Sequence, residues 1–323
     1  MASILRLQRS SASPEVVQPP ATPLPLDTPP SIAHLFEQLP GKPCYYRWHD
    51  ETAHYRVLGE GPPLLLVHSP DVGASCLEWR CNLEPLAEHY RVFAVDLPGY
   101  GLSGVNPHAY TAALYIEFLA DFLRDVCGST TRIIASVRGA SYAVHVAVRH
   151  PEQVERLLLV APAGLSSFRP LPFGRVIFRV LGLSAVWSTI SSATTSHQAI
   201  LEHLQQDVYD EVLLAGERAV ETRYQLCHRP NGEWVERSRL AGLMNIDIRS
   251  AVWRLQKPVM LIWGRHATSP PLDEAEVFHE LNPATQFVLF ERSSIAPHEE
   301  EPKRFNETAL TFLHLNFMPG YTA

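Results

Sequence analysis

The chain has 323 residues, of which 46% are hydrophobic and 19% are charged, a balance typical of a globular protein with a large buried core. Disorder throughout the chain, a collagen-like repeat and a coiled coil are therefore excluded. The formal net charge is -7, from 34 acidic and 27 basic side chains, so the chain lacks the basic footprint that nucleic-acid binding needs. We expect no nucleic-acid partner.

The beginning of the chain is rich in proline. Seven of the 27 prolines lie within residues 1–30, and this density prevents both helix formation and strand pairing. We therefore expect residues 1–30 to form an extended tail. Arg6 and Arg9, with nearby serines and no acid before Glu15, faintly resemble an organelle transit peptide. We favour the alternative, in which the tail docks on its own domain or on a partner.

The cysteines and the apolar runs bear on the compartment. Five cysteines form an odd set without a C-x-x-C pair, so we expect reduced thiols, no metal and no cofactor. No uninterrupted apolar run reaches the roughly 18 residues of a membrane span, and residues 1–18 lack the apolar centre of a secretory signal. These patterns predict an intracellular protein that is soluble or peripherally membrane-associated.

From Tyr45 onward, strand-like apolar runs alternate with helical patterns, which is typical of a mostly parallel sheet with crossover helices. The bounded apolar runs predict strands at residues 64–68, 91–96, 131–135, 157–160, 259–264 and 287–290. Amphipathic patterns predict helices at residues 76–89, 110–127, from 139 to the proline at 151, and 302–317.

Between residues 165 and 255 the strand signals nearly vanish, and helical, aromatic and charged segments dominate. We interpret residues 165–255 as an inserted helical cap. The core then consists of residues 31–164 and 256–323.

Five motifs resemble those of the α/β-hydrolase superfamily, in the same order and spacing. They are His68 after its strand, the Asp96-x-Pro98-Gly99-x-Gly101 turn, the strand-turn-helix around Gly139, Trp263-Gly264, and Pro297 to Pro302. The resemblance covers about residues 45 to 317 and is to the cap-bearing, esterase- or lipase-like branch. It implies an α/β fold with a mostly parallel eight-stranded sheet, helices on both faces and an inserted helical cap.

The superfamily places its nucleophile in a G-x-S-x-G turn that lifts the side chain toward a histidine base. The corresponding stretch runs from Ala135 to Gly139, and the resemblance assigns the nucleophile position to Val137. Valine has neither a proton to lose nor a lone pair with which to attack. Ser136 is adjacent, but neighbouring residues on a sharp turn point in different directions, and Ser141 is a weaker substitute.

The acid and base positions are altered in the same way. The acid position, the third residue after Gly264, is Ala267, and His266 beside it does not have the expected spacing. The base position is Ile295. His298 stands at the second histidine of that stretch, where we expect a structural hydrogen-bonding role.

The oxyanion hole of the superfamily uses one backbone N–H just beyond a His-Gly pair and one from the residue after the nucleophile. Here the first stretch is His68-Ser69-Pro70, and proline has no N–H. The second donor would be the backbone of Arg138. Because a buried arginine is rarely left unpaired, we expect its side chain to pair with Asp71 or with a ligand carboxylate.

These replacements together predict a catalytically degenerate member, a non-catalytic binding or assembly protein for a partner protein or a hydrophobic ligand. Its apolar pocket floor would be either packed shut or occupied by a ligand without turnover. The alternative is an esterase-type hydrolase with a non-standard nucleophile such as Ser136. The candidate pocket residues are His68, Ser69, Pro70, Asp71, Ser136, Arg138, His266 and His298.

Residues 168–181 interleave arginines with large apolar side chains, a composition that suits a helix at a membrane surface or against a partner. A cap helix packed over the pocket mouth fits the same composition. The candidate contact residues are Phe168, Arg169, Phe173, Arg175, Phe178 and Arg179. Peripheral membrane contact and a protein partner held through the tail or the cap are thus both predicted.

Overall fold

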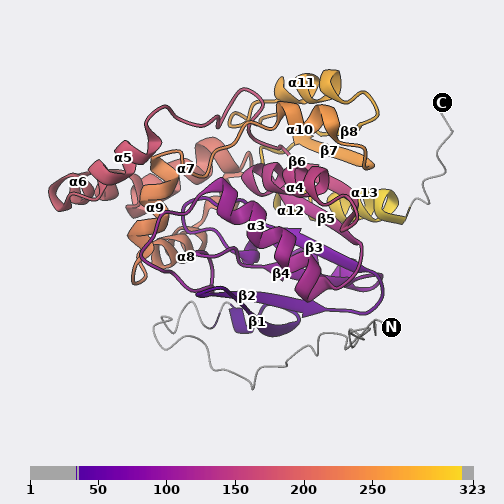
Figure 1. The fold of residues 1–323 in the computed structure, drawn as a ribbon, viewed down its shortest axis with the longest axis horizontal. Coiled ribbons are helices and arrows are strands. Elements are labelled where there is room, and N and C mark those ends of the chain that lie inside the picture. The colour runs from indigo at the N-terminus through magenta and orange to yellow at the C-terminus, as the bar shows by residue number, and fades with distance from the viewer. Residues whose placement is uncertain (1–33, 35, 315–323) are drawn as a thin grey trace, which may run out of the picture.

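The computed structural model describes residues 34 and 36–314 and contains one eight-stranded sheet (Figure 1). The strand order is β1-β2-β4-β3-β5-β6-β7-β8; β1 and β2 pair antiparallel, β2 is antiparallel to β4, and the remaining pairs are parallel. The strands are β1 Lys42–Trp48, β2 Glu51–Leu58, β3 Pro63–Val67, β4 Arg91–Val95, β5 Thr131–Ser136, β6 Val154–Val160, β7 Val259–Gly264 and β8 Gln286–Phe290. The predicted mostly parallel, eight-stranded sheet is confirmed, and the predicted tail lies outside the described residues.

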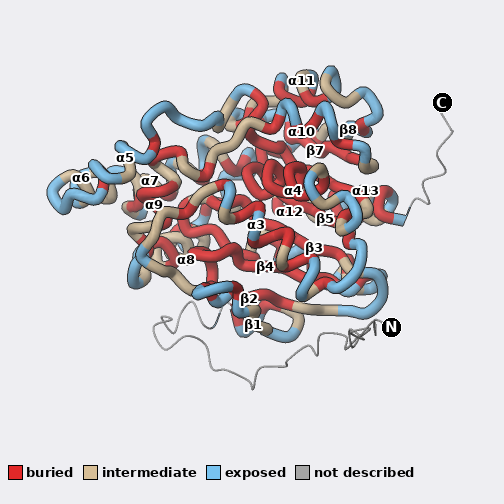
Figure 2. The backbone as a smooth tube through the Cα atoms, viewed as in Figure 1, coloured by how far each residue is buried: buried red, intermediate tan, exposed pale blue. Residues whose placement is uncertain are grey.

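Helices cover both faces of the sheet, as expected for buried parallel strands. One face carries α3 (Ala112–Phe122), α4 (Val137–Arg149), α10 (Arg249–Arg254) and α11 (Glu274–Leu281). The other carries α2 (Leu83–Ala87) and α13 (Pro302–His314). Figure 2 shows the central strands and α4 as the most buried part of the molecule.

The predicted helix over residues 76–89 is wrong as one continuous element. The structure has a 3-10 helix, η1 (Cys76–Trp79), followed by α2. Between them Asn82 is fully buried, and its side-chain amide donates to the carbonyl of His298 and to Asn306. These tertiary hydrogen bonds fix the chain where the helical pattern alone would have continued.

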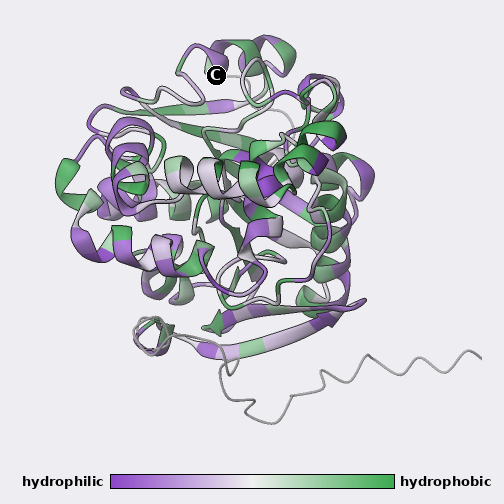
Figure 3. Cartoon of the chain, turned by 90° about the vertical axis from the view of Figure 1, so that its left-hand side faces the viewer, coloured by the Kyte–Doolittle hydropathy of each residue, from purple (hydrophilic) through white to green (hydrophobic). Residues whose placement is uncertain are grey.

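The segment between β6 and β7 is helical, and none of its described residues between 165 and 255 lies in a strand. Before α10 it contains α5 (Gly174–Leu181), α6 (Ser184–Thr194), α7 (His197–His203), η3 (Leu204–Val208), η4 (Val212–Ala215), α8 (Glu217–Cys227) and α9 (Gly232–Leu240). α5 and α6 project from the body in Figure 1, and Figure 3 turns this side toward the viewer. α10 packs on α4 and α11, so the boundary of the cap at residue 255 stays a prediction.

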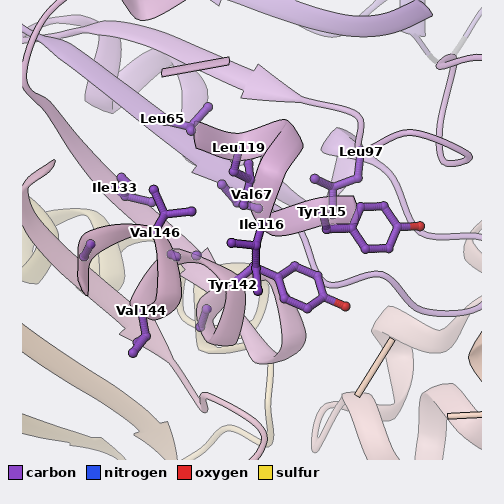
Figure 4. Packing of buried hydrophobic residues seen from close by; sticks show 14 of the residues in the cluster. Leu65, Val67, Leu97, Tyr115, Ile116, Leu119, Ile133, Tyr142, Val144 and Val146 are labelled. Carbon is purple, nitrogen blue, oxygen red and sulfur yellow. The ribbon is translucent and has the colours of Figure 1, made fainter. Parts of the chain in front are cut away.

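Side chains alternate along each buried strand. Leu65 and Val67 of β3 enter the core beneath α3 and α4, whereas Leu64 and Leu66 enter the core beneath α2 and α13. Figure 4 shows the first core, in which Tyr115 from α3 lies near α4. A fully buried side chain of this kind contributes about 1.5 to 3 kcal/mol. The two cores hold the carboxyl ends of the parallel strands together, where the candidate site lies.

Among the residues that the structure describes, no single helix combines the length and the apolar composition needed to cross a bilayer.

Candidate functional site

A sharp turn joins β5 to α4 at the centre of the sheet. Val137 is the first residue of α4 and has a φ of 43°, a backbone conformation that is rare for a β-branched residue. Two residues later the chain passes close to the end of β3, and only glycine fits there. A Cβ on Gly139 would lie 2.5 Å from the carbonyl oxygen of His68. The turn therefore has the shape that presents a nucleophile, and the side chain it presents is an isopropyl group.

The floor around this turn is apolar and closed. Val137, Ala267 and Ile295 are buried in a single hydrophobic cluster, although they come from three distant parts of the chain. The cap contributes Leu204 and Val208 to the same cluster. The cavity beside Val137 has a volume of about 30 Å³, which has room for water but not for a substrate.

A polar group lies at one side of the floor. The hydroxyl of Ser136 donates to Oε1 of Glu78 at 2.5 Å, and Nε2 of His298 lies 3.1 Å from the same oxygen. All three residues line the small cavity. The carboxylate thus lies between the serine and the histidine, so His298 is not in position to take the serine proton directly.

The environment keeps Glu78 ionised. Burial by itself raises the pKa of Glu78, but the neighbouring His298, together with His68 and the Ser136 hydroxyl, outweighs burial and leaves the pKa below its usual value. An ionised carboxylate accepts hydrogen bonds, and it also accepts one from the backbone N–H of Ser69 at 3.3 Å. Glu78 therefore joins the loop after β3 to the end of β5 by accepting a hydrogen bond from each.

The expected pairing of Arg138 with Asp71 is not what the structure shows. Nε of Arg138 donates to Asn245 at 3.1 Å, and Nη1 donates to the carbonyl of Pro70 at 3.3 Å. The guanidinium also lies 4.2 Å from the ring centre of Phe168. The expected Asp71 partner is wrong, because neutral acceptors and an aromatic face, all brought in by tertiary contacts, take the place of that carboxylate. The alternative partner, a ligand carboxylate, stays a prediction.

Asp71 instead joins the core to the cap. One of its oxygens lies 3.1 Å from Nε2 of His203 in α7, and the other lies 3.6 Å from Arg239 in α9. Burial raises the pKa of Asp71, but His203 and Arg239 lower it by more, so the pKa lies well below its usual value. Asp71 therefore stays ionised, and its contacts with His203 and Arg239 link two cap helices to the loop after β3.

The two remaining candidate histidines have different surroundings. His68 is fully buried, donates to the carbonyl of Ser69 at 2.9 Å and accepts from the N–H of Leu97 at 3.1 Å. Burial lowers its pKa, so it is a neutral, structural side chain. His266 is exposed and lies 3.2 Å from a carboxylate oxygen of Asp210. His266 thus faces solvent, while His298 lies inside with Glu78.

A larger pocket, with a volume of about 480 Å³, lies beside the small cavity and shares Ala74, Glu78, Arg223 and Glu299 with it. Its walls come from η1, η4, α8 and residues 38–40. The lining is partly apolar and partly charged, and the charged members are Glu78, Arg80, Arg218, Arg223 and Glu299. Sequence analysis did not find this pocket.

One buried group has the residue types of a metal site. Ligand atoms of His54, Cys76 and Asp96 lie within 4.8 Å of one another. The carboxylate of Asp96, however, already accepts from the backbone N–H groups of Cys76 at 2.6 Å and Leu102 at 2.9 Å, and contacts Nδ1 of His54 at 2.7 Å. Its lone pairs are used to hold the turn after β4, so this group fits a structural role.

A model of the alpha/beta hydrolase family matches residues 64–308, more than half of the chain. The chain belongs to the alpha/beta hydrolase family. This confirms the superfamily that the five sequence motifs indicated. The match spans the core strands from β3 onward and the helical segment between β6 and β7.

Relatives and solved structures are similar over most of the chain. A pimeloyl-[acyl-carrier protein] methyl ester esterase of Vibrio vulnificus is 27% identical over 280 residues, 80% of this chain and 97% of the relative. A meta-cleavage product hydrolase from Pseudomonas fluorescens has a TM-score of 0.67 and 23% identity, covering 81% of this chain and 94% of the other. The enol-lactonase from Burkholderia xenovorans has a TM-score of 0.68 and 19% identity, covering 84% of this chain and 100% of the other. The two structures support the fold alone.

Within this alpha/beta hydrolase, the six candidate contact residues of the stretch 168–181 differ in how far they are exposed. Phe168 and Phe178 are half-buried, the first against Arg138 and the second against Arg237, and Arg169 lies 3.5 Å from Asp247. Phe173, Arg175 and Arg179 are exposed. Phe168 and Phe178 thus pack against the protein, whereas the other four candidates, including Arg169, are exposed.

Sequence reasoning missed Glu78, His203, Arg223 and Glu299. Glu78, His203 and Arg223 lie in no motif, whereas Glu299 lies in the stretch from Pro297 to Pro302, where the resemblance assigns a role only to His298. Each of the four contacts a segment far away in the chain: Glu78 contacts Ser136, His203 contacts Asp71, Arg223 donates to Val72, and Glu299 contacts Arg80. The acids of the stretch from Pro297 to Pro302 were a usable signal, since three carboxylates in a row beside a buried turn need partners.

Proposed function

We propose that this alpha/beta hydrolase is a non-catalytic binding protein that forms no acyl-enzyme. The observation that carries the proposal is the joint burial of Val137, Ala267 and Ile295 in one apolar cluster closed by Val208. Covalent acyl transfer needs an activated nucleophile within reach of a base, and these three side chains have no atom for either role. Their convergence supports the assignment of the three positions, because three separate alignment errors would not bring the residues together.

The larger pocket supports ligand binding beside the closed floor. Its volume of about 480 Å³ falls in the usual range for small-molecule sites. Arg218 donates to Gln38 at 3.3 Å and, within residues 36–314, forms no ion pair with a carboxylate. Arg223 donates to the carbonyl of Val72 at 3.0 Å, and the nearby Glu299, Asp71 and Glu78 offset its charge. Leu39, Leu77 and Leu214 add apolar surface, so the chemistry favours a ligand with an apolar body and one anionic group.

Thermal unfolding with matched ligands tests the binding proposal. We expect dodecanoate to raise the midpoint of unfolding while dodecanol, which lacks the charge, raises it much less. Arg218→Gln should weaken the apparent affinity for dodecanoate at least fivefold, because it removes a cation from the pocket. Arg265→Gln, an exposed arginine paired with Glu291 elsewhere, is the matched control. Equal shifts with acid and alcohol, or no shift with either, would contradict the proposal.

Ester turnover and a fluorophosphonate probe test the absence of acyl transfer. We expect neither p-nitrophenyl butyrate hydrolysis above background nor labelling of the wild-type protein. Val137→Ser alone should also remain inactive, because Ala267 and Ile295 provide no acid and no base. Appreciable activity in that single variant would refute the assignment of these two positions.

A second candidate function is esterase-type hydrolysis with Ser136 as the nucleophile. The hydrogen bond from Ser136 to Glu78 favours it, as do the relatives that are named esterases. The position of the carboxylate between Ser136 and His298 is unfavourable, since the family's route passes the proton from serine to histidine. Probe labelling of the wild type that is lost in Ser136→Ala would select this function over the first.

A further inference from the structure

Helix α5 has one apolar face that already packs on the protein. Gly174, Phe178 and Leu181 follow helical spacing and face inward. Phe178 lies 5.9 Å from the ring of Trp234 in α9, and the guanidinium of Arg237 lies 4.6 Å from the Phe178 ring. The helix is thus anchored to the cap without using its other side.

The other side of α5 is also apolar, and it is exposed. Phe173, Val176, Val180 and Leu183 repeat at intervals of three and four residues and are 80%, 53%, 47% and 59% exposed. Val176 and Val180 lie within the helix and, by the 100° rotation per residue of an α-helix, nearly opposite its inward face. Phe173 and Leu183 flank the helix as the N-cap residues of α5 and α6. An apolar stripe of this kind on a helix that already has a buried face indicates contact with something outside the molecule.

Helix α6 follows α5 at a bend of 99° and contains no buried residue and no charged residue (Figures 1 and 3). Its large apolar side chains, Val186, Trp187 and Ile190, are half-buried, and its exposed residues are serines, alanines and a threonine. Six of the seven hydroxyls of this helix and its C-cap donate to carbonyls three or four residues earlier: Ser188, Thr189, Ser191, Ser192, Thr194 and Thr195. This pattern satisfies polar groups locally, which is what an apolar environment requires.

The charge on this segment is the reverse of that on the whole chain. No Asp or Glu occurs between residues 156 and 201, although the chain contains 34 acids and has a formal net charge of -7. Arg175 and Arg179 are exposed beside the apolar stripe of α5. An apolar stripe flanked by arginines and free of acids is complementary to an anionic lipid surface.

We propose that the α5–α6 segment, residues 173–194, docks in the interface of an anionic lipid bilayer. Phe173, Val176, Val180 and Leu183 enter the region between headgroups and acyl chains, and Arg175 and Arg179 contact lipid phosphates. The helices have 8 and 11 residues, about 12 and 16 Å in length, so each lies at the surface of a bilayer whose apolar core is about 30 Å thick. A bilayer is favoured over a protein partner because the segment between residues 156 and 201 contains no acid and two exposed arginines, Arg175 and Arg179, flank the stripe, a charge that complements lipid phosphates.

Co-sedimentation of the full chain with vesicles tests the proposal. We expect binding to vesicles of phosphatidylcholine with 30% phosphatidylglycerol and much weaker binding to phosphatidylcholine alone. Phe173→Ser with Val176→Ser should reduce the partition coefficient at least tenfold. Arg175→Gln with Arg179→Gln should reduce it about 25-fold at low salt, since each basic residue near an anionic surface contributes about fivefold.

Trp253→Ser is the matched control, because Trp253 is 73% exposed but lies in α10, outside the α5–α6 segment and outside the larger pocket. It should bind vesicles as the wild type does, and circular dichroism should show all variants folded. A wild-type protein that stays in the supernatant with both vesicles overturns the proposal. So does an equal loss in the Trp253→Ser variant, or concentration-dependent dimerisation that Phe173→Ser abolishes, which would make a second copy the occupant.

Discussion

Val137 places a β-branched side chain in a backbone conformation that such residues rarely adopt. In a strained turn of this kind the conformation costs on the order of 1 to 3 kcal/mol and persists because the surrounding structure enforces it. The turn is enforced by β5 on one side and by close contact between Gly139 and the carbonyl of His68 on the other. The geometry of a nucleophile turn is thus retained around a residue whose side chain has a packing role.

This predicts an unusual response to Val137→Gly. Glycine relieves the positive φ, and we expect this gain to offset most of the roughly 2 kcal/mol lost with the buried side chain. Val144→Gly in the same helix is the control, since Val144 is also buried but has an ordinary helical backbone, and it should cost about 3 kcal/mol or more. Urea denaturation measures both. Equal costs for the two variants would contradict the strain argument.

Six of the eight strands were predicted because they are short apolar runs with sharp ends, and β7 was predicted over its full range, Val259–Gly264. The antiparallel strands β1 and β2 were missed, because polar and charged residues interrupt their apolar ones. The segment at residues 76–89 was predicted less well, because the break before α2 depends on Asn82 bonding to a residue more than 200 positions away. Side-chain periodicity carries no signal of such a bond. The end of β7 depends on a similar close contact, where Gly264 meets the chain after β8.

Gly264→Ala should therefore be strongly destabilising. A Cβ at Gly264 would lie 1.9 Å from the carbonyl oxygen of Ser294 and 2.2 Å from that of Ser293, so backbone must shift. We expect a loss of several kcal/mol or a failure to fold. Gly104→Ala is the control, because the nearest atoms to its added Cβ are 3.6 Å away. Thermal unfolding compares the two, and a tolerated Gly264→Ala would show that this end of β7 is not rigid.

At the scale of the whole molecule, the cap is held on the core by charge as well as by apolar packing. Burial lowers the pKa of His203, but Asp71 and Asp207 outweigh burial and raise it to about 9. His203 is therefore a cation at neutral pH and pairs with Asp71 across the cap-core boundary. Because its folded pKa lies above the ordinary value near 6.5, its contribution is complete below about pH 6.5 and is lost as the pH rises through about 9.

His203→Gln should consequently lower stability by on the order of 2 kcal/mol at pH 6, and the difference from wild type should shrink between pH 6.5 and 9. Urea unfolding at pH 6, 7.5 and 9.5 measures the difference. His266→Gln is the control, because His266 forms an exposed pair with Asp210 and exposed pairs contribute little. A difference between His203→Gln and wild type that does not change with pH would show that the ion pair does not hold the cap.

Apolar periodicity and turn residues predicted most of the sheet, its main helices and the family, because these patterns are local and can be read directly in the sequence. The resemblance also placed Val137, Ala267 and Ile295 at the positions of the family's chemistry, and this assignment stays a prediction. The sequence did not reveal that these three side chains pack together, that Arg138 contacts Asn245 instead of Asp71, or that Phe168 faces inward. Those outcomes depend on contacts between residues distant in the chain, and the positions of such partners are set by packing of the whole core.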